Sequence, residues 1–517
     1  MKRNNLLKWL PVIILILVSS CSDDFLEVDP VGKWEDPNYP ATNDDALSVL
    51  MGAYDLMQWN YGRDWKSAYF AKNLPADDCN AGSFASDQPP YQNLDDFVNE
   101  ADNPVTTGIW EGFYKTINHC NILLTRLVAD NDYKKHIAAE AKAIRAWNYF
   151  ELVTLFGDVP YYTEPTTMDN CHRPRTSTSE IYTKIENDLK DAIDVLPLKS
   201  ELPGNQKFRI SKGAAQAMLG KVYLYQEKWS EAHGVLSEVI LTEGDEYDLE
   251  PDFENVWKKA GELGKESVFE ILYTSQEGYD WGNFPWSPGL HESNVHIVLM
   301  GPRSDLFADV DSVGLLFGWG FNLPTASIGE AFEAMGDHGP RYKNTIMSEA
   351  EFTAAGVEIA ADSEDDFHDY EGYMRMKYAT YADESNPAAS VKDLNYTTNW
   401  RIIRYADVLL MAAEAYNEDD LEADALRELN KVRKRADLDL YDSSMSKDEL
   451  REAIKAERQL ELAFEGSRYW DLIRWGDAEE ELSSLGFVAG KHEHFPIPQT
   501  EISSNNEISQ EDQNPGF

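Results

Sequence analysis

Residues 219–236 read LGKVYLYQEKWSEAHGVL, and this stretch decides the fold. Its large apolar residues recur at spacings of three and four, which places them on one face of a helix. The polar residues 226–228 interrupt the pattern, and Ala232 and Leu236 resume it. A small residue such as Gly220 lets a neighbouring helix approach closely. The stretch therefore predicts two helices that pack tightly against each other.

Similar pairs occur elsewhere in the chain. The spacing of Gly220, Tyr223, Trp229 and Leu236 resembles the tetratricopeptide pattern. Looser copies run over residues 143–149 and 412–425. Such units bury their apolar faces only by stacking, so at least three are expected. Generic antiparallel helices without a true repeat are the alternative.

Helical periodicity covers two long regions of the chain. Spacings of three and four predict helices over about 44–58, 105–129, 133–156, 177–196, 211–227, 229–242, 402–418, 420–436 and 446–475. We expect Ser177 or Ser179, with Glu180, to cap the fourth of these, and Pro197 to stop it. The sequence therefore predicts a mostly α-helical protein.

The middle of the chain, about 243–400, has a different character. Residues 278–324 hold seven glycines, four prolines and eight aromatic residues. Glycine and proline at this density break regular elements, so the rings must lie on loops or short strands. Loops carried by a rigid scaffold are where binding groups concentrate. We therefore expect the ligand to bind here.

Aromatic rings are suited to binding sugars. The apolar C–H face of a pyranose stacks on an indole or phenyl ring, while Asn, Asp and Arg side chains bind its hydroxyls. The predicted ligand rings are Tyr279, Trp281, Phe284, Trp286 and Trp319, together with Phe84 and Tyr91 from a second aromatic segment nearer the N-terminus. Packing in the core beneath the loops is the alternative for each ring.

Catalytic signatures are missing from the sequence. It contains no G-x-S-x-G elbow, no phosphate loop and no G-x-G-x-x-G fingerprint. An acidic run from Asp362 to Asp369 could attract calcium, but Phe367 stands where an EF-hand needs its glycine. We predict a non-enzymatic protein without a cofactor and leave calcium open.

Charged residues recur at helical spacing near the C-terminus. The set is Glu457, Arg458, Glu461, Glu465, Arg468, Asp471 and Arg474. Opposite charges three or four residues apart pair across helical turns. We predict that these residues form a structural ion network rather than a catalytic site.

The overall charge excludes one class of partner. The chain carries 46 Lys and Arg against 92 Asp and Glu, a net charge of −46. Nucleic-acid affinity comes largely from basic side chains that neutralise phosphates, so nucleic acid is excluded as a ligand. Attachment to a membrane through a basic patch is equally disfavoured.

The N-terminus carries an export signal. Three basic residues, Lys2, Arg3 and Lys8, precede an apolar run over 9–18, and this run is too short to span a bilayer. The run ends in Val18-Ser-Ser-Cys21, which resembles a bacterial lipoprotein box in which the cysteine is acylated. An ordinary secretory signal with an incidental cysteine is the alternative. We predict a signal peptide over 1–20, a lipidated tether over 21–43 and a single domain over 44–517.

Three cysteines remain after Cys21. Cys120 lies in an apolar helical stretch and is expected to be a buried small hydrophobe. A disulfide between Cys79 and Cys171 is left open, since the sequence gives no distance between them.

Several motifs together resemble one family. They are Cys21–Leu26, Ala139–Trp147 with Leu155–Pro160, Ala456–Gly466 with Trp470–Gly476, and Phe495–Pro498 with Asn514–Phe517. The chain resembles the SusD/RagB family, the surface nutrient-binding lipoproteins of Bacteroidetes. The resemblance covers nearly the whole chain after the signal peptide. It transfers ligand residues only by region, because the family varies most where it binds.

The resemblance implies an architecture and a function. It implies about four tetratricopeptide-like helix pairs, mainly over 44–242 and 400–490, that support a variable ligand face over about 243–400. It also implies a lipid-anchored protein at the outer-membrane cell surface, which captures an oligosaccharide or polysaccharide and passes it to a SusC-like TonB-dependent transporter. A peptide-capturing lid of the same fold and a surface glycoside hydrolase are the alternatives.

Overall fold

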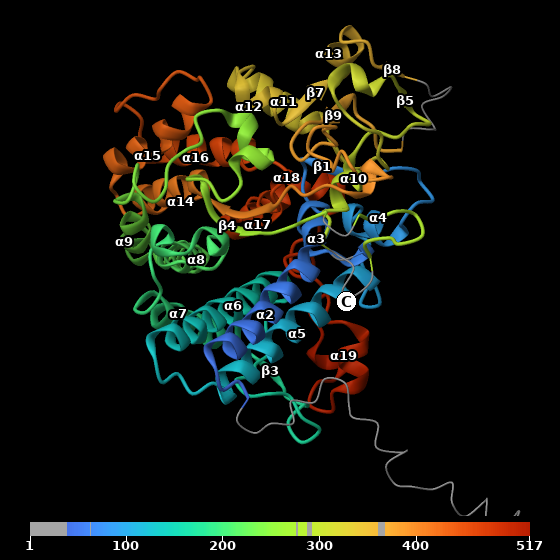
Figure 1. The fold of residues 1–517 in the computed structure, drawn as a ribbon. Helices are drawn as coiled ribbons and strands as arrows, with labels where there is room; N and C mark the ends of the chain where they lie inside the picture. Colours follow the sequence, from blue (N-terminus) through green and yellow to red (C-terminus); the bar gives the residue numbers. More distant parts are fainter. Residues whose placement is uncertain (1–38, 63, 276–277, 287–291, 360–367) are drawn as a thin grey trace, which may run out of the picture.

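A computed structural model describes residues 39–62, 64–275, 278–286, 292–359 and 368–517 (Figure 1). The predicted signal peptide, Cys21 and nearly all of the predicted tether lie outside the described residues. The same holds for most of the acidic run that begins at Asp362.

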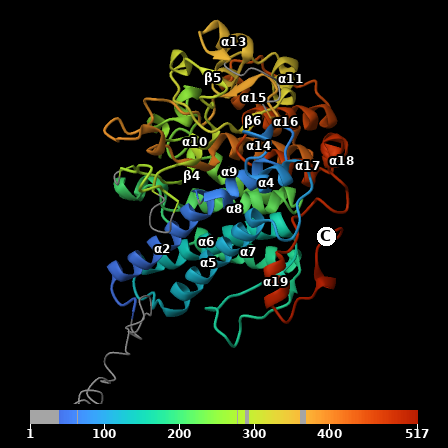
Figure 2. The same cartoon turned by 90° about the vertical axis from the view of Figure 1, so that its right-hand side faces the viewer.

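The protein is built on a curved stack of helices (Figures 1 and 2). Its main members are α2 (Asn43–Gly62), α5 (Pro104–Arg126), α6 (Asp132–Phe156), α7 (Thr178–Ile193), α8 (Lys212–Leu224), α9 (Trp229–Ile240), α14 (Tyr405–Glu418), α15 (Glu422–Arg435), α16 (Lys447–Glu461) and α17 (Arg468–Trp475). Each helix from α5 to α9 packs on the next, and α9 packs on α14 across a long insertion. The prediction of a mostly helical protein is confirmed.

The pair α8 and α9 shows why residue 220 must be a glycine. A Cβ atom on Gly220 would lie 2.4 Å from Leu236 Cδ2 and 2.5 Å from Leu236 Cγ. Leu236 is fully buried at this contact. Two helices can approach this closely only where one of them has no side chain, so Gly220 sets the spacing of the pair.

Two predicted helices differ from the structure. The helix expected to begin near 402 begins at Tyr405, because residues Trp400–Arg404 form strand β10, which pairs antiparallel with β4 (Ser267–Ile271). Adjacent β-branched residues in this strand favour the extended conformation. The helix expected over 446–475 is broken after Glu461, where Phe464 (φ 63°) and Gly466 (φ 73°) adopt left-handed conformations that an α-helix cannot contain.

The remaining elements are short and surround the loops. The helices are α3 (Ala68–Asn73), α4 (Pro89–Asp95), α10 (His296–Met300), α11 (Ala326–Met335), α12 (Pro340–Lys343), α13 (Glu349–Ala354), α18 (Ala478–Leu482) and α19 (Gln499–Ser504). The strands pair antiparallel in twos: β1 (Cys79–Gly82) with β6 (Phe321–Pro324), β2 (Val159–Pro160) with β3 (Arg175–Thr176), β5 (Phe307–Ala308) with β8 (Glu358–Ile359), and β7 (Ile346–Ser348) with β9 (Tyr373–Arg375).

The predicted ion network is confirmed and lies in the core. Arg458 on α16 bonds Asp407 on α14 at 3.0 Å and Asp471 on α17 at 2.9 Å. Burial alone would raise the pKa of Asp407, but Lys221 and Arg458 outweigh it and hold the pKa at about 2. A buried charge with paired neighbours fixes how three helices meet, which is a structural role.

The three cysteines among the described residues are free thiols. Cys79 and Cys120 are fully buried, as expected for Cys120, and Cys171 is half-buried in the loop between β2 and β3. The bridge between Cys79 and Cys171 that the sequence left open is therefore not formed. Within the described ranges, no helix combines the length and the apolar content needed to cross a membrane.

Candidate functional site

A tight turn presents the most exposed of the predicted rings. The backbone N–H groups of Gly282 and Asn283 both donate to Asp280 Oδ1 at 2.8 Å, which closes the turn. Asp280 and Asn283 also pair with each other through their backbones. Trp281 lies at the tip of this turn and is 58% exposed.

Phe284 joins Trp281 to two further rings. Its ring stacks on Trp281 with centroids 5.8 Å apart and planes inclined by 27°. It also lies 6.3 Å from Trp319 at 28° and 4.6 Å from Trp286 at 77°. Centroid separations of 4.5–7 Å are typical of favourable aromatic pairs. The structure therefore brings together four of the seven predicted ligand rings.

Trp319 is held in place by a close backbone contact. A Cβ on Gly318 would lie 2.4 Å from the Cα of Gly301, so the two segments can approach only because residue 318 is glycine. The Trp319 N–H donates to the Val298 carbonyl oxygen at 2.9 Å. The ring is thus carried by backbone that is fixed on both sides, although the indole itself is only half-buried.

Trp65 completes the cluster and was not among the predicted ligand residues. It lies in the short 3-10 turn η2 (Asp64–Lys66), 4.7 Å from Trp286 and 5.7 Å from Trp319 by ring centroids. In the sequence Trp65 is one of several aromatic residues over 59–70, and this pattern does not distinguish a ligand ring from a packing ring. We call Trp65, Trp281, Phe284, Trp286 and Trp319 the aromatic platform.

Tyr91 and Tyr279 were predicted as ligand rings, and the structure corrects both. Each is 0% exposed. Tyr91 lies in α4 and stacks on Phe70 with ring centroids 4.9 Å apart, beneath Trp65. The Tyr279 N–H donates to Asn395 Oδ1 at 2.9 Å, and its ring belongs to a buried apolar cluster. Both rings support the platform from below because their large apolar surface is more stable out of water.

A buried histidine lies in the same supporting layer. His296 is 5.2 Å from Phe70 by ring centroids and is fully buried. Burial lowers its pKa to about 3, so the imidazole is neutral at physiological pH. His296 therefore places no imidazolium charge in the layer beneath the platform.

Phe84 lies beside the platform rather than in it. The guanidinium of Arg303 covers its ring at 3.9 Å, and the same group bonds Asp87 and Asp305 at 2.9 Å each. The Ser83 N–H donates to the carbonyl oxygen of Gly320 at 2.6 Å, which joins this segment to the one that carries Trp319. Arg303 is thus a hydrogen-bonding group at the edge of the rings.

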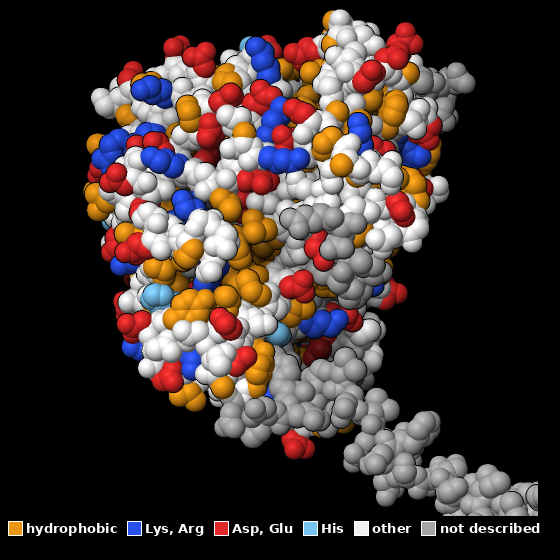
Figure 3. Space-filling view, viewed as in Figure 1, with side chains coloured by type: hydrophobic (Ala, Val, Ile, Leu, Met, Phe, Trp, Pro, Cys, Tyr) orange, Lys and Arg blue, Asp and Glu red, His pale blue; other side chains and the backbone are white. Residues whose placement is uncertain are grey.

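The platform therefore combines apolar rings with polar neighbours. Asp280 and Asn283 are exposed on either side of Trp281. Figure 3 shows that hydrophobic side chains also gather in a central hollow of the molecule, with charged side chains on the surface around it. An exposed ring face with amide and carboxylate groups beside it suits a ligand that has both an apolar face and hydroxyl groups.

Comparisons with known proteins address the family. A model described as the SusD family matches residues 326–492, and one described as starch-binding associating with outer membrane matches residues 44–224. A solved structure described as a laminarin-binding SusD-like protein is 34% identical, with a TM-score of 0.81 over 92% of this chain and 99% of that chain. The chain belongs to the SusD family.

Other SusD-family relatives agree over nearly the full length. Surface glycan-binding protein A from Bacteroides fluxus is 27% identical, with a TM-score of 0.77 over 92% of this chain and 100% of that one. SusD-like protein P2 of Formosa agariphila is 28% identical over 98% of both chains. Four of the five platform rings lie between the two segments that the SusD-family models match.

Proposed function

We propose that this SusD-family protein binds a neutral glycan on its aromatic platform. The observation that carries the proposal is the exposed face of Trp281, which is backed by Phe284 and continued by Trp319. A polysaccharide presents successive pyranose faces, so a row of rings offers successive stacking positions. Asp280, Asn283 and Arg303 supply the hydrogen bonds that orient the hydroxyl groups.

The charge of the chain supports a neutral ligand. With a net charge of −46, the protein repels sulfated or uronate-rich polymers at long range. The relative at 34% identity is described as laminarin-binding, which makes laminarin, a neutral glucan, the first ligand to test.

The proposal extends to place and partner. We infer that Cys21 is acylated and holds the protein at the outer-membrane surface, in keeping with the matched description of starch binding that associates with the outer membrane. There it would capture oligosaccharides and pass them to a SusC-like TonB-dependent transporter. Capture needs no catalysis and no cofactor, because binding and release complete the task.

Titration calorimetry tests the proposal. Purified protein is titrated with laminarin, starch, a sulfated galactan and a mixed peptide library, and each mixture is then assayed for released reducing sugar. We expect binding to laminarin or another neutral glycan without release of sugar. Binding of peptides alone would support a peptide-capturing lid, and release of sugar would show a glycoside hydrolase.

A further inference from the structure

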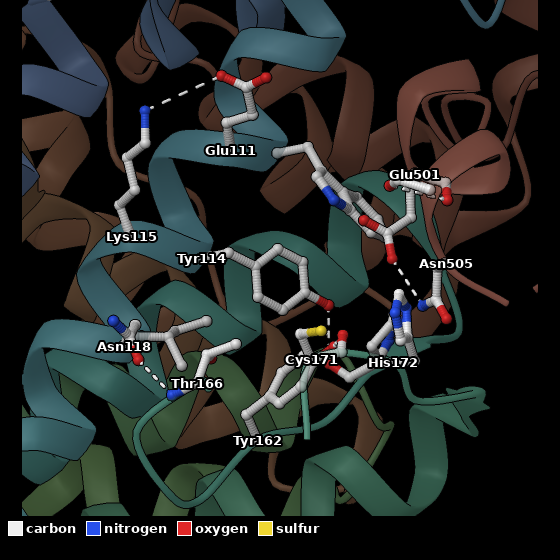
Figure 4. Close-up of a pocket in the computed structure, with 14 residues that line it drawn as sticks. Glu111, Tyr114, Lys115, Asn118, Tyr162, Thr166, Cys171, His172, Glu501 and Asn505 are labelled. Atoms are coloured by element: carbon white, nitrogen blue, oxygen red, sulfur yellow. Dashed lines mark hydrogen bonds and ion pairs between the residues drawn. The ribbon is translucent and has the colours of Figure 1, made fainter. Parts of the chain in front are cut away.

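A second hollow lies away from the platform, between α5, the loop that joins β2 and β3, and α19 (Figure 4). Figures 1 and 2 both show α19 beside α5. The hollow has a volume of about 450 Å³. Small-molecule sites fall in the range of roughly 300–1,000 Å³, so this one can hold a ligand of a few rings.

The floor of this hollow, the distal pocket, is aromatic and held rigidly. Trp110 and Tyr114 contact each other with ring centroids 5.0 Å apart, and Tyr114 meets Tyr162 at 5.9 Å. Tyr114 Oη donates to the Pro160 carbonyl oxygen at 2.7 Å, and Tyr162 Oη donates to that of Cys171 at 2.8 Å. The phenol groups are satisfied by the protein, so the rings need no reorganisation when a ligand binds.

The rim of the distal pocket is polar and mixed in charge. Glu111 and Lys115 stand on one side of Tyr114, and Glu501 and Asn505 stand on the other (Figure 4). Glu111 is 4.0 Å from Lys115, and both side chains are about half exposed, so neither is committed to a strong ion pair. Two carboxylates and one ammonium disfavour an anion, while donors and acceptors together suit hydroxyl groups.

The distal pocket connects towards the platform. A neighbouring hollow of about 540 Å³ shares Glu111 with the distal pocket and is lined by other residues of α19, and Lys66 also lines it. Lys66 directly follows the platform residue Trp65 and contacts α5 at Gly108, where a Cβ would lie 2.7 Å from Lys66 Cβ. The two hollows therefore follow α5 from the turn that carries Trp65 to the distal pocket.

We propose that the distal pocket is a second saccharide site, which holds a remote part of the same neutral glycan chain that stacks on the platform. This inference rests on the proposed function. The stretch of α5 from Gly108 to Asn118 rises about 15 Å. A disaccharide on the platform therefore does not reach the distal pocket, whereas a polysaccharide does.

Cys171 reports on occupancy of the distal pocket. It lines the pocket and is half-buried, while Cys79 and Cys120 are fully buried. In the full chain with Cys21→Ser, a thiol-reactive dye should therefore label Cys171 alone. We expect laminarin to slow this labelling at least fivefold and laminaribiose to leave it unchanged.

A blocking variant provides the second readout. Ser504 lines the pocket from the exposed side of α19, so Ser504→Trp should fill the pocket without disturbing the core. Asn506→Trp is the matched control, because Asn506 is exposed and lines neither hollow. We expect about tenfold weaker laminarin binding in Ser504→Trp, with the melting temperature of the native chain, and native affinity in the control.

The outcomes separate the two proposals. If the native chain binds laminarin but its labelling rate does not change, or if Ser504→Trp keeps native affinity, the distal site is overturned and the platform stands. If the native chain binds no neutral glycan at all, the proposed function fails and the distal site fails with it.

Discussion

The indole of Trp281 stacks on Phe284 with ring centroids 5.8 Å apart, yet 58% of Trp281 remains exposed. One face of the indole is thus supported by the protein and the other is open to solvent. The open face of the indole is the surface on which the proposed function places the ligand, because a pyranose stacks on such a face.

Replacing Trp281 separates binding from folding. Trp281→Ala should weaken laminarin binding about tenfold, which corresponds to about 1.4 kcal/mol of lost stacking. The melting temperature should stay within about 1 °C, because the ring buries little of the core. Trp229→Ala, which removes a half-buried tryptophan from α9, should keep native affinity in the same calorimetric titration. An equal loss in both variants would contradict the platform assignment.

The buried network predicts a large difference between two arginines of α16. Arg458 is 1% exposed and bonds two buried aspartates, so Arg458→Ala leaves them without their partner and should cost about 3–5 kcal/mol of unfolding free energy. Arg451 is 33% exposed and pairs with Glu418 and Asp448, so Arg451→Ala should cost about 1 kcal/mol or less. Urea denaturation measures both, and similar costs would refute a structural role for the network.

Asp78 predicts a pH dependence of stability. Burial, and then the nearby charge of Asp77, raise the pKa of Asp78 to about 6. A carboxyl whose pKa is raised by folding contributes stability below about pH 4, and this contribution is lost as the pH rises through 6. Asp78→Asn cannot ionise, so it should gain about 3 kcal/mol relative to the native chain between pH 4 and pH 7. Urea denaturation at several pH values in this range measures the unfolding free energy of both proteins. A difference between them that does not change with pH would contradict the prediction.

Two glycines of the α8–α9 pair predict opposite effects. Gly220→Ala places a methyl group 2.4 Å from Leu236 Cδ2, and such overpacking should cost about 1–3 kcal/mol. A Cβ on Gly234 of α9 meets no atom within 4 Å. Gly234→Ala should therefore stabilise the helix by about 0.5–1 kcal/mol. Thermal unfolding measures the stability of both variants. If Gly220→Ala did not change the melting temperature, α8 and α9 could move apart without loss of stability.

The proposed acylation of Cys21 predicts an effect on growth of the cell without an effect on glycan binding. Cys21→Ala should leave glycan affinity of the purified protein unchanged and should slow growth of the source bacterium on that glycan. Calorimetry on the purified variant checks the affinity, and the growth rate of cells that carry the variant checks uptake. Normal growth would show that uptake does not depend on the anchor.

Much of the scaffold could be predicted because its helices are amphipathic over long stretches. The periodicity of residues 211–242 is confirmed by α8 and α9, and Ser177 accepts the Glu180 N–H at 3.3 Å as the predicted cap of α7. The break after Glu461 was missed, because the left-handed conformation of Phe464 is imposed by its surroundings. Phe464 is fully buried, and its backbone N–H donates to Asp78 on a distant segment.

At the candidate site, too, the sequence predicted the region but not which of its rings are exposed. Composition alone marked residues 278–324 as the ligand region, and Trp281, Phe284, Trp286 and Trp319 do lie together. Composition could not distinguish these four rings from Tyr279 and Tyr91, which are also aromatic and stand in similar sequence but are buried.

The sequence by itself determined the helical class, the resemblance to a family and the region in which the aromatic rings concentrate. These follow from local periodicity and composition, which need no knowledge of distant contacts. Only the tertiary structure decided which rings reach solvent, that Trp65 joins the platform, and that Trp110, Tyr114 and Tyr162 line a second pocket. The physical reason is that exposure depends on which segments pack over a side chain, and those segments are remote in sequence.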